Sequence, residues 1–196
     1  MPLTALALCA RALLRIGAQP IASLDEGTAE AEVAANLYPA IRDALVTAHP
    51  WSFATALVPL ARLSAVPAAD FRHAYALPPG FLRALSAGGG GPGSGSGGGS
   101  GRGIAYRIHE SRLLTDAEAV TLTCIFRPDE SAFPAFFASA LVARLAAEFC
   151  LPLTESASRA EMLFRLAETE LRQARQIDSQ QATPRAIEGF PLVDVR

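Results

Sequence analysis

Residues 133–150 read FPAFFASALVARLAAEFC, a stretch whose apolar side chains cover nearly every face of the helix that it predicts. A helix that is apolar all round has to be surrounded by other elements of the fold. The apolar run stops at Arg144, whereas a membrane span requires about 18 consecutive apolar residues. We therefore expect the core helix of a soluble protein, with no membrane contact.

The start of this stretch is rich in aromatic residues. Phe133, Phe136 and Phe137 fall within five residues, and Trp51 and Phe53 follow an earlier predicted helix. Large aromatic side chains supply much of the apolar surface that cores and interfaces bury. We expect these five residues to pack inside a helical domain or to line a subunit interface.

Three further helices are predicted by apolar residues that recur at steps of three and four. These apolar positions span residues 3–16, 33–48 and 163–177. Gly17 is expected to end the first of the three helices, and His49-Pro50 to end the second. Pro39 lies inside the second helix and should bend it or mark a locally adjusted turn.

Charged residues support these helices. The pairs Asp25-Glu26 and Asp129-Glu130 each precede a predicted helix, where the helix dipole favours carboxylates, so we expect them to act as caps. Opposite charges four residues apart predict ion pairs on the outer faces of the last two helices. These pairs are Arg144–Glu148, Glu161–Arg165 and Glu168–Arg172.

The middle of the chain has the pattern of short strands. Its segments contain alternating or β-branched apolar residues and are separated by turn signals, several with proline. They are WSFATALVPLARL (51–63), HAYALPPGFLRAL (73–85), IAYRIHE (104–110), SRLLTDAEA (111–119) and AVTLTCIFR (119–127). We expect a small antiparallel sheet of about four strands.

Residues 88–103 contain 11 of the 15 glycines of the chain, interspersed with serine. Such a composition predicts a flexible coil at the tip of an elongated hairpin, although an engineered linker would have the same composition. A phosphate-binding loop is excluded, because no Gly-Lys-Ser or Gly-Lys-Thr follows and no helix begins there.

The order of these segments predicts a mainly α fold. Residues 1–50 and 128–182 are expected to form an antiparallel domain resembling a four-helix bundle. A small antiparallel β-sheet subdomain, residues 51–127, is inserted into it and carries the flexible loop 88–103. Residues 183–196 are predicted to be an extended C-terminal docking tail.

Composition limits the kinds of ligand. The net charge is −2 and all 17 basic residues are arginine, so a broad basic face that grips nucleic acid is not expected. The three cysteines, Cys9, Cys124 and Cys150, are widely spaced and form no Cys-x-x-Cys pair. We expect buried thiols in a reducing cytoplasm, and no disulfide, metal or other cofactor.

An enzyme is not expected either. His49, His73 and His109 lie in three different predicted elements, and no motif of a zinc protease, serine hydrolase or nucleotide-binding loop occurs. His49 follows a helix, where it can bond the last backbone carbonyls. The sequence therefore predicts no catalytic and no metal-binding residue.

The segment RAIEGFPLVDVR (185–196) is unusual because it is rich in apolar residues although it follows a polar helical stretch. It cannot fold on itself to bury them. Its apolar residues Ile187, Phe190, Leu192 and Val193 need a surface to cover them. The segment could fold back on its own domain as a strap. The alternative is insertion into a groove or sheet edge of another subunit or protein.

An ordered set of segments resembles one known family. LLRIGAQPIASLDEG (13–27) has a helix that ends in glycine and a proline-containing link, and ANLYPAIRDALVTAHPWSFA (35–54) has a helix that ends in an aromatic motif. YALPPGFLRAL (75–85) and FPAFFASALVARLAAEFCLPLTES (133–156) follow in order. Together they resemble the head–tail adaptor family of tailed bacteriophages, also called tail tubular protein A. The glycine-rich stretch departs from the short hairpin usual in this family.

The resemblance implies a structural protein of the virion, made in the host cytoplasm and placed at the head–tail interface. Members are similar in forming a dodecameric ring that joins the portal protein to a distal nozzle or stopper protein. Double-stranded DNA passes through the lumen without specific binding. In such a ring we expect the tail to dock on the portal or on a neighbouring subunit, through Ile187, Phe190, Leu192, Val193 and Arg196.

Two other functions stay open at this point. One is the same adaptor role in a long-tailed phage or a gene transfer particle, where the distal partner is a stopper ring. The other is a small non-viral peptide-binding module whose glycine-rich loop orders on its ligand. The second alternative requires the C-terminal segment to be a strap packed on its own domain.

Overall fold

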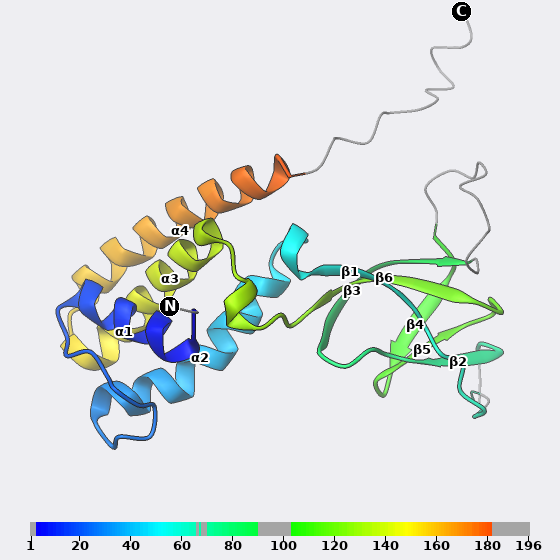
Figure 1. Ribbon diagram of the computed structural model, residues 1–196, viewed down its shortest axis with the longest axis horizontal. Helices are drawn as coiled ribbons and strands as arrows, with labels where there is room; N and C mark the ends of the chain where they lie inside the picture. The colour runs from blue at the N-terminus through cyan, green and yellow to red at the C-terminus, as the bar shows by residue number, and fades with distance from the viewer. Residues whose placement is uncertain (1–2, 66, 68–69, 90–102, 182–196) are drawn as a thin grey trace, which may run out of the picture.

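The computed structural model describes residues 3–65, 67, 70–89 and 103–181 of the chain, and Figure 1 shows its helices gathered at one end and its strands at the other. The helices of this described part are α1 (Ala5–Ile16), α2 (Ala29–Thr47), α3 (Ala135–Thr154) and α4 (Ala157–Ser179). Its strands are β1 (Thr55–Pro59), β2 (His73–Ala76), β3 (Phe81–Gly89), β4 (Tyr106–His109), β5 (Arg112–Thr115) and β6 (Val120–Phe126). All the described strands thus lie between α2 and α3 in the sequence.

The prediction of a mainly α fold resembling a four-helix bundle is wrong. Helices make up 49% and strands 20%, so the fold is mixed α and β. The described strands form two antiparallel three-stranded sheets, in the orders β1-β6-β3 and β2-β5-β4, where the sequence predicted one sheet of about four strands. Three of these strands have only four residues, too few for their pattern to show which neighbours they pair with.

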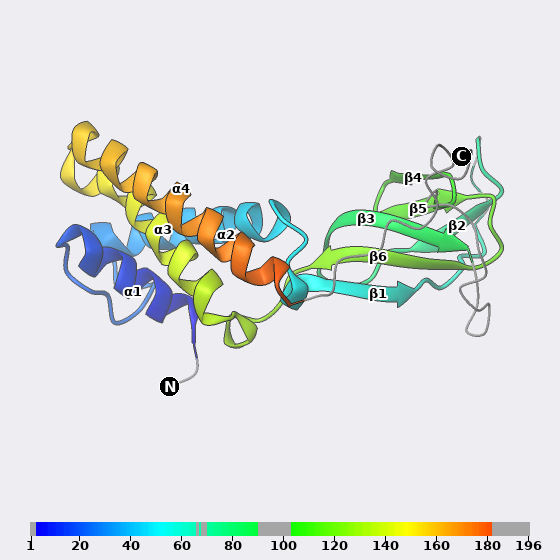
Figure 2. The ribbon, with the colours of Figure 1, turned by 90° about the horizontal axis from the view of Figure 1, so that it is seen from above.

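The helices also pack differently from a bundle. Helix α3 packs against α4, α1 and α2, and Figure 2 shows α4 running alongside it. Three helices thus surround one, as the apolar residues on all sides of α3 require. Helix α3 is long and apolar enough to cross a membrane, but 61% of its most apolar window is buried inside the protein, as in a core helix.

The helix ends confirm some predictions. Helix α1 begins where the Thr4 hydroxyl accepts a hydrogen bond from the Ala7 N–H, and it ends at Gly17, whose φ of 78° favours glycine. Thr28 caps α2 in the same way as Thr4 caps α1. Pro39 is accommodated in α2, which continues to Thr47.

Neither acidic pair caps an α-helix. Glu26 accepts hydrogen bonds from the N–H groups of Ala22 and Ser23, and so closes a turn that precedes α2. A short 3-10 helix, Glu130–Ala132, separates Asp129 from α3, and no side chain caps α3. The capping predictions for these pairs are therefore wrong.

The ion pairs are a mixed result. Arg144–Glu148, with 2.8 Å between nitrogen and oxygen, and Glu161–Arg165 form as predicted. Glu168 instead contacts Arg144 of the neighbouring helix at 3.4 Å. From Glu168, Arg172 contacts the backbone carbonyl and not the carboxylate. The packing of α4 on α3 thus replaces the predicted Glu168–Arg172 pair.

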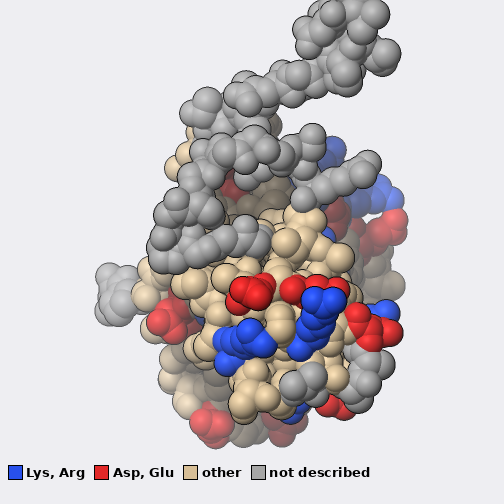
Figure 3. All heavy atoms as spheres, turned by 90° about the vertical axis from the view of Figure 1, so that its right-hand side faces the viewer, with Lys and Arg blue, Asp and Glu red and all other residues tan. Residues whose placement is uncertain are grey.

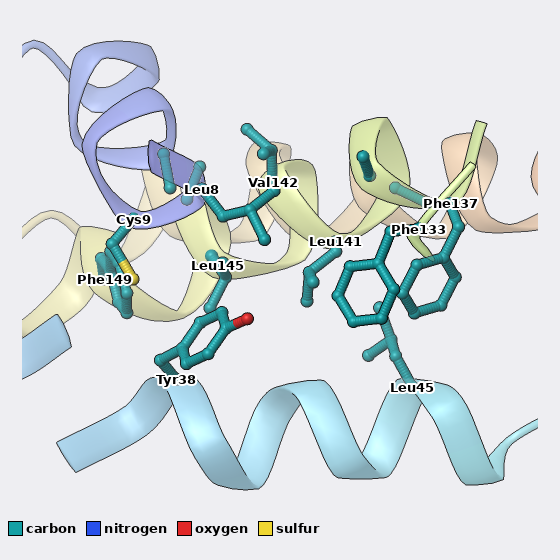
Figure 4. Close-up of a cluster of buried hydrophobic side chains, with 14 of the residues drawn as sticks. Leu8, Cys9, Tyr38, Leu45, Phe133, Phe137, Leu141, Val142, Leu145 and Phe149 are labelled. Carbon is teal, nitrogen blue, oxygen red and sulfur yellow. The ribbon is translucent and has the colours of Figure 1, made fainter. Parts of the chain in front are cut away.

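Two hydrophobic cores fill the described protein. The first lies among the helices, where Figure 4 shows Tyr38 and Leu45 of α2 pointing toward α3. The second lies between the sheets and contains Tyr75, Leu113 and Leu122. The three cysteines are buried and free, as predicted, and burial raises the pKa of Cys9 to about 12.

The glycine-rich segment connects strands of different sheets. Of its residues, 90–102 lie outside the described part of the chain. The Ile104 N–H donates to the Ala87 carbonyl at 3.0 Å, so the two flanks of the segment lie side by side. A Cβ on Gly103 would come within 2.5 Å of that carbonyl oxygen, so only glycine fits there. Among the described residues, β3 pairs with β6 and β4 pairs with β5, so no ladder between β3 and β4 continues from this contact, and the predicted hairpin tip itself lies outside the described part.

Candidate functional site

The five aromatic residues singled out from the sequence come together where α3 meets the start of β1. Trp51 and Phe137 are fully buried, Phe133 is 7% exposed, and Phe53 and Phe136 are half-buried. The ring centroid of Phe137 lies 5.1 Å from that of Trp51, and 4.9 Å from those of Phe53 and Phe133. These are the separations of favourable aromatic pairs. The cluster therefore packs the joint between the helices and the strands.

A buried carboxylate holds one of the two links by which the chain passes between the helices and the strands, the link from α2 to β1. Asp178, near the end of α4, is only 5% exposed. It accepts hydrogen bonds from the Ser52 N–H, at 3.1 and 3.2 Å, and from the Ser52 hydroxyl, at 2.7 Å. The adjacent Trp51 indole N–H donates to the Leu45 carbonyl of α2 at 2.9 Å. The link from α2 to β1 is thereby bonded to two helices.

The presence of a serine, a histidine and an aspartate at this joint invites comparison with a catalytic triad. The His49 ring lies 3.6 Å from Asp178, but no hydrogen bond joins it to Ser52 in the described structure. A triad needs the histidine between the other two groups, whereas here the aspartate is in the middle. Burial lowers the pKa of His49, which the nearby Asp178 only partly offsets. The three residues therefore have a structural role at the link from α2 to β1. The contact of His49 with Asp178 replaces the predicted hydrogen bond from His49 to the helix carbonyls.

A second polar network holds the other link between the strands and the helices, from β6 to α3. Asp43 of α2 accepts a hydrogen bond from Arg42 at 2.9 Å and is bonded by Arg127, which follows β6. Glu130 accepts from the Tyr38 hydroxyl at 2.9 Å and from Arg42 at 3.2 Å. Arg42 therefore joins the two carboxylates, and α2 is bonded to the start and to the middle of the link.

The pKa values of these groups follow from the network. Burial alone would raise the pKa of Asp43, but hydrogen bonds from Arg127 and Arg42 outweigh it and lower the pKa. For Glu130, hydrogen bonds from its own backbone, Tyr38 and Arg42 likewise outweigh burial and lower the pKa. Burial, together with the charge of Glu130, raises the pKa of Tyr38. Both carboxylates are thus charged at neutral pH, and Tyr38 is neutral.

An apolar depression, which we call the α3 groove, borders the N-terminal half of α3. It consists of two cavities that share Ser139. The first, of about 510 Å³, lies between α1 and α3 and is lined in part by Leu3, Arg11, Phe133 and Val142. The second, of about 430 Å³, lies between α3 and α4 and is lined in part by Phe136, Leu166 and Ile177.

Charged residues divide and border the groove. Between the cavities, Glu170 of α4 accepts hydrogen bonds from Arg15 at 3.0 Å and from the Ser139 hydroxyl at 2.8 Å. Arg11, one turn earlier on α1, is exposed and makes no ion pair or hydrogen bond with a described residue. The groove can therefore accept an apolar segment that carries a negative charge near the α1 side.

Other residues considered from the sequence lie apart from these features. The predicted docking residues Ile187, Phe190, Leu192, Val193 and Arg196 lie outside the described part of the chain. His73 and His109 line neither cavity of the α3 groove, and His109 is exposed beside Glu110. Within the described ranges, no three His, Cys, Asp or Glu residues are placed to hold a metal ion.

Figure 3 views the β end of the protein, where acidic and basic side chains lie side by side over the described surface. The exposed pair Arg107–Asp70 joins β4 to the segment before β2, with 2.5 Å between nitrogen and oxygen. Charges of both signs thus alternate on this face.

Sequence reasoning missed the joint carboxylates, although a signal for one of them exists. The buried residues Ala167, Leu171 and Ala174 of α4 are spaced by four and three, and Asp178 continues that series. An acidic residue on the buried face of a helix indicates a bonded, structural carboxylate. No comparable pattern marks Asp43 or Glu130, whose partners come from distant elements.

Compared with known proteins, the chain matches no protein-family model and no curated sequence. The resemblance to head–tail adaptors therefore stays a prediction from the sequence segments quoted above.

Proposed function

We propose that the chain is the subunit of a ring-shaped head–tail adaptor of a tailed bacteriophage. The ring, dodecameric as the resemblance implies, joins the portal to a distal nozzle or stopper protein at the head–tail interface of the virion. Double-stranded DNA passes through its lumen without specific binding. The role is structural and requires neither catalysis nor a cofactor.

The observation that carries the proposal is the way the two ends of the elongated subunit are joined (Figure 1). Asp178 is hydrogen-bonded to the link from α2 to β1, and Asp43 and Glu130 take part in the hydrogen bonds that hold the link from β6 to α3. A subunit whose two ends hold a fixed orientation can present separate surfaces to a partner above and a partner below. Such rigidity serves a connector, which transmits the position of one ring to the next.

Surface charge is consistent with this role. A conduit for DNA works best without clusters of cations that retain phosphates. The net charge of −2 and the alternating charges in Figure 3 accord with passage of DNA without retention.

The test is co-sedimentation with the portal ring encoded by the same genome. Full-length chain, a chain truncated after Ala182 and an Arg185→Gln control, which changes the tail before the residues expected to dock, are compared. We expect the full chain and the control to bind in stoichiometric rings, and the truncated chain to lose binding. Equal binding of all three would leave the ring role and remove the docking role of the tail. Failure of the full chain to bind would contradict the adaptor proposal.

A second candidate function, a peptide-binding module, is favoured by the α3 groove. Its larger cavity of about 510 Å³ is within the size of ordinary ligand sites. A module of this kind would stay monomeric in the presence of the portal ring, whereas an adaptor would assemble on it. Sedimentation of the mixture therefore separates the two functions.

A further inference from the structure

The α3 groove is an apolar surface that no described residue covers. Its α4 side exposes Leu166 (48%) and Ile177 (43%), and half-buried Phe136 of α3 lines the same cavity. Leaving such side chains in water is unfavourable. Exposed apolar side chains gathered in a groove are suited to binding another apolar segment.

One segment of this chain has the composition to fill the groove. Residues 187–194, IEGFPLVD, carry Ile187, Phe190, Leu192 and Val193 between and beside two acids, Glu188 and Asp194. The apolar side chains match the apolar part of the lining, which also contains polar residues such as Thr169 and Gln173. The acids match Arg11, which has no partner among the described residues.

The segment also starts from the right place. Helix α4 ends at Ser179, two residues after Ile177, which lines the α3–α4 cavity. Each copy therefore releases its C-terminal segment beside its own groove, at the joint. The sequence does not favour extension of α4 into this segment, because Pro184 biases the preceding residue against the helical conformation.

We propose that residues 187–194 of one copy bind in the α3 groove of a neighbouring copy, with Glu188 or Asp194 facing Arg11. The inference rests on the proposed ring, because a contact in which each copy gives one segment and receives another can repeat around a closed ring of copies. It names what holds neighbouring subunits together. The portal could then be bound by another surface.

Cross-linking between two full-length variants tests the contact. One chain carries Leu166→Cys in the groove and the other carries Phe190→Cys in the segment, and a short bis-maleimide is added to the mixture. The native cysteines are buried, so the wild-type chain supplies the background. A matched control carries Leu57→Cys, an exposed apolar residue of β1 (73%) far along the chain from the groove. We expect linked pairs with Leu166→Cys and none with Leu57→Cys.

A chain with both Leu166→Cys and Phe190→Cys separates the two possible geometries. We expect a ladder of linked chains on denaturing gels. Linkage only within one chain would overturn the exchange between copies, and no linkage would overturn the groove as the binding site. Neither result depends on the portal, so a failure here is distinct from a failure of the adaptor proposal.

A charge in the groove supplies an independent measurement. Leu166→Glu is expected to weaken self-association of the full chain by about tenfold or more in analytical ultracentrifugation, because it places a carboxylate in the apolar contact. Met162→Glu, at an exposed position (63%) of α4 that does not line the groove, is the control and should change association little. Equal effects of the two substitutions would contradict the proposal.

Discussion

At the scale of single residues, three carboxylates connect the helices to the strands. Asp178 is the most buried of them and accepts both the N–H and the hydroxyl of Ser52. Removing a buried acceptor leaves its donors without partners, which costs more than the net value of the hydrogen bonds. These residues therefore matter more to stability than the exposed ion pairs of α4.

We expect Asp178→Ala to lower the free energy of unfolding by about 2–3 kcal/mol, because two Ser52 donors lose their acceptor. Urea denaturation followed by circular dichroism measures the change. Glu161→Ala, which removes an exposed ion pair, is the control and should change stability by less than about 1 kcal/mol. Similar losses in the two variants would mean that the Asp178 contact adds nothing to the fold.

The other two carboxylates predict a dependence on pH. The pKa values of Asp43 and Glu130 are lowered in the folded protein from 3.8 and 4.5. A carboxylate with a lowered pKa stabilises the fold at pH above its unfolded value, and this contribution is lost as the pH falls through the folded value. The wild type should therefore exceed the Asp43→Asn, Glu130→Gln double variant in stability by a constant amount above about pH 5.

Below about pH 4.5 that difference should shrink, because the wild-type carboxylates become protonated as well. Chemical denaturation of both proteins over a series of pH values measures it. The comparison cancels the contribution of His49, whose lowered pKa removes stability as the pH falls below 6.5. A difference that stays constant down to pH 3 would show that the network does not hold these groups ionised.

At the scale of elements, α2 contains an avoidable weakness. Pro39 is exposed inside the helix and has no N–H to donate to the carbonyl one turn earlier. Pro39→Ala should raise the free energy of unfolding by about 1–2 kcal/mol, after allowance for the greater freedom of the unfolded chain. Thermal denaturation measures the change. Ala40→Gly, next to it, should lower stability by about 1 kcal/mol, and a loss of stability in Pro39→Ala would instead mean that the proline serves the packing of α2.

The helices could be predicted from the sequence, whereas the sheets could not. Helices α1 and α3 are long enough for their apolar pattern to repeat, and local signals such as Gly17 mark an end. Strand β5 has only four residues. It forms a hairpin with β4, but its other partner, β2, lies far along the chain, so its place in the sheet depends on a contact that no local pattern contains. Underestimating such strands led to the wrong expectation of a mainly α fold.

The candidate site was predictable in its apolar part. The spacing of Phe133, Phe136 and Phe137 indicated a cluster, and the structure brings Trp51 and Phe53 to it. The polar joint and the α3 groove depend on side chains from α1, α2 and α4 that meet only in the folded protein. Sequence spacing within one element cannot reveal such meetings.

At the scale of the whole molecule, the protein has two ends with a hydrophobic core each, joined by aromatic packing and bonded carboxylates. The helical end carries the α3 groove, and the C-terminal segment leaves from the joint. One copy thus offers both halves of a contact that could repeat around a ring. The proposed adaptor makes use of each of these features.

The most direct measurement of the central claim is electron microscopy of the full-length chain mixed with the portal ring from the same genome. The adaptor proposal predicts a second ring, coaxial with the portal, with one central channel through both. Free portal rings beside unassembled chains, at concentrations far above those needed for stable phage connectors to form, would contradict it.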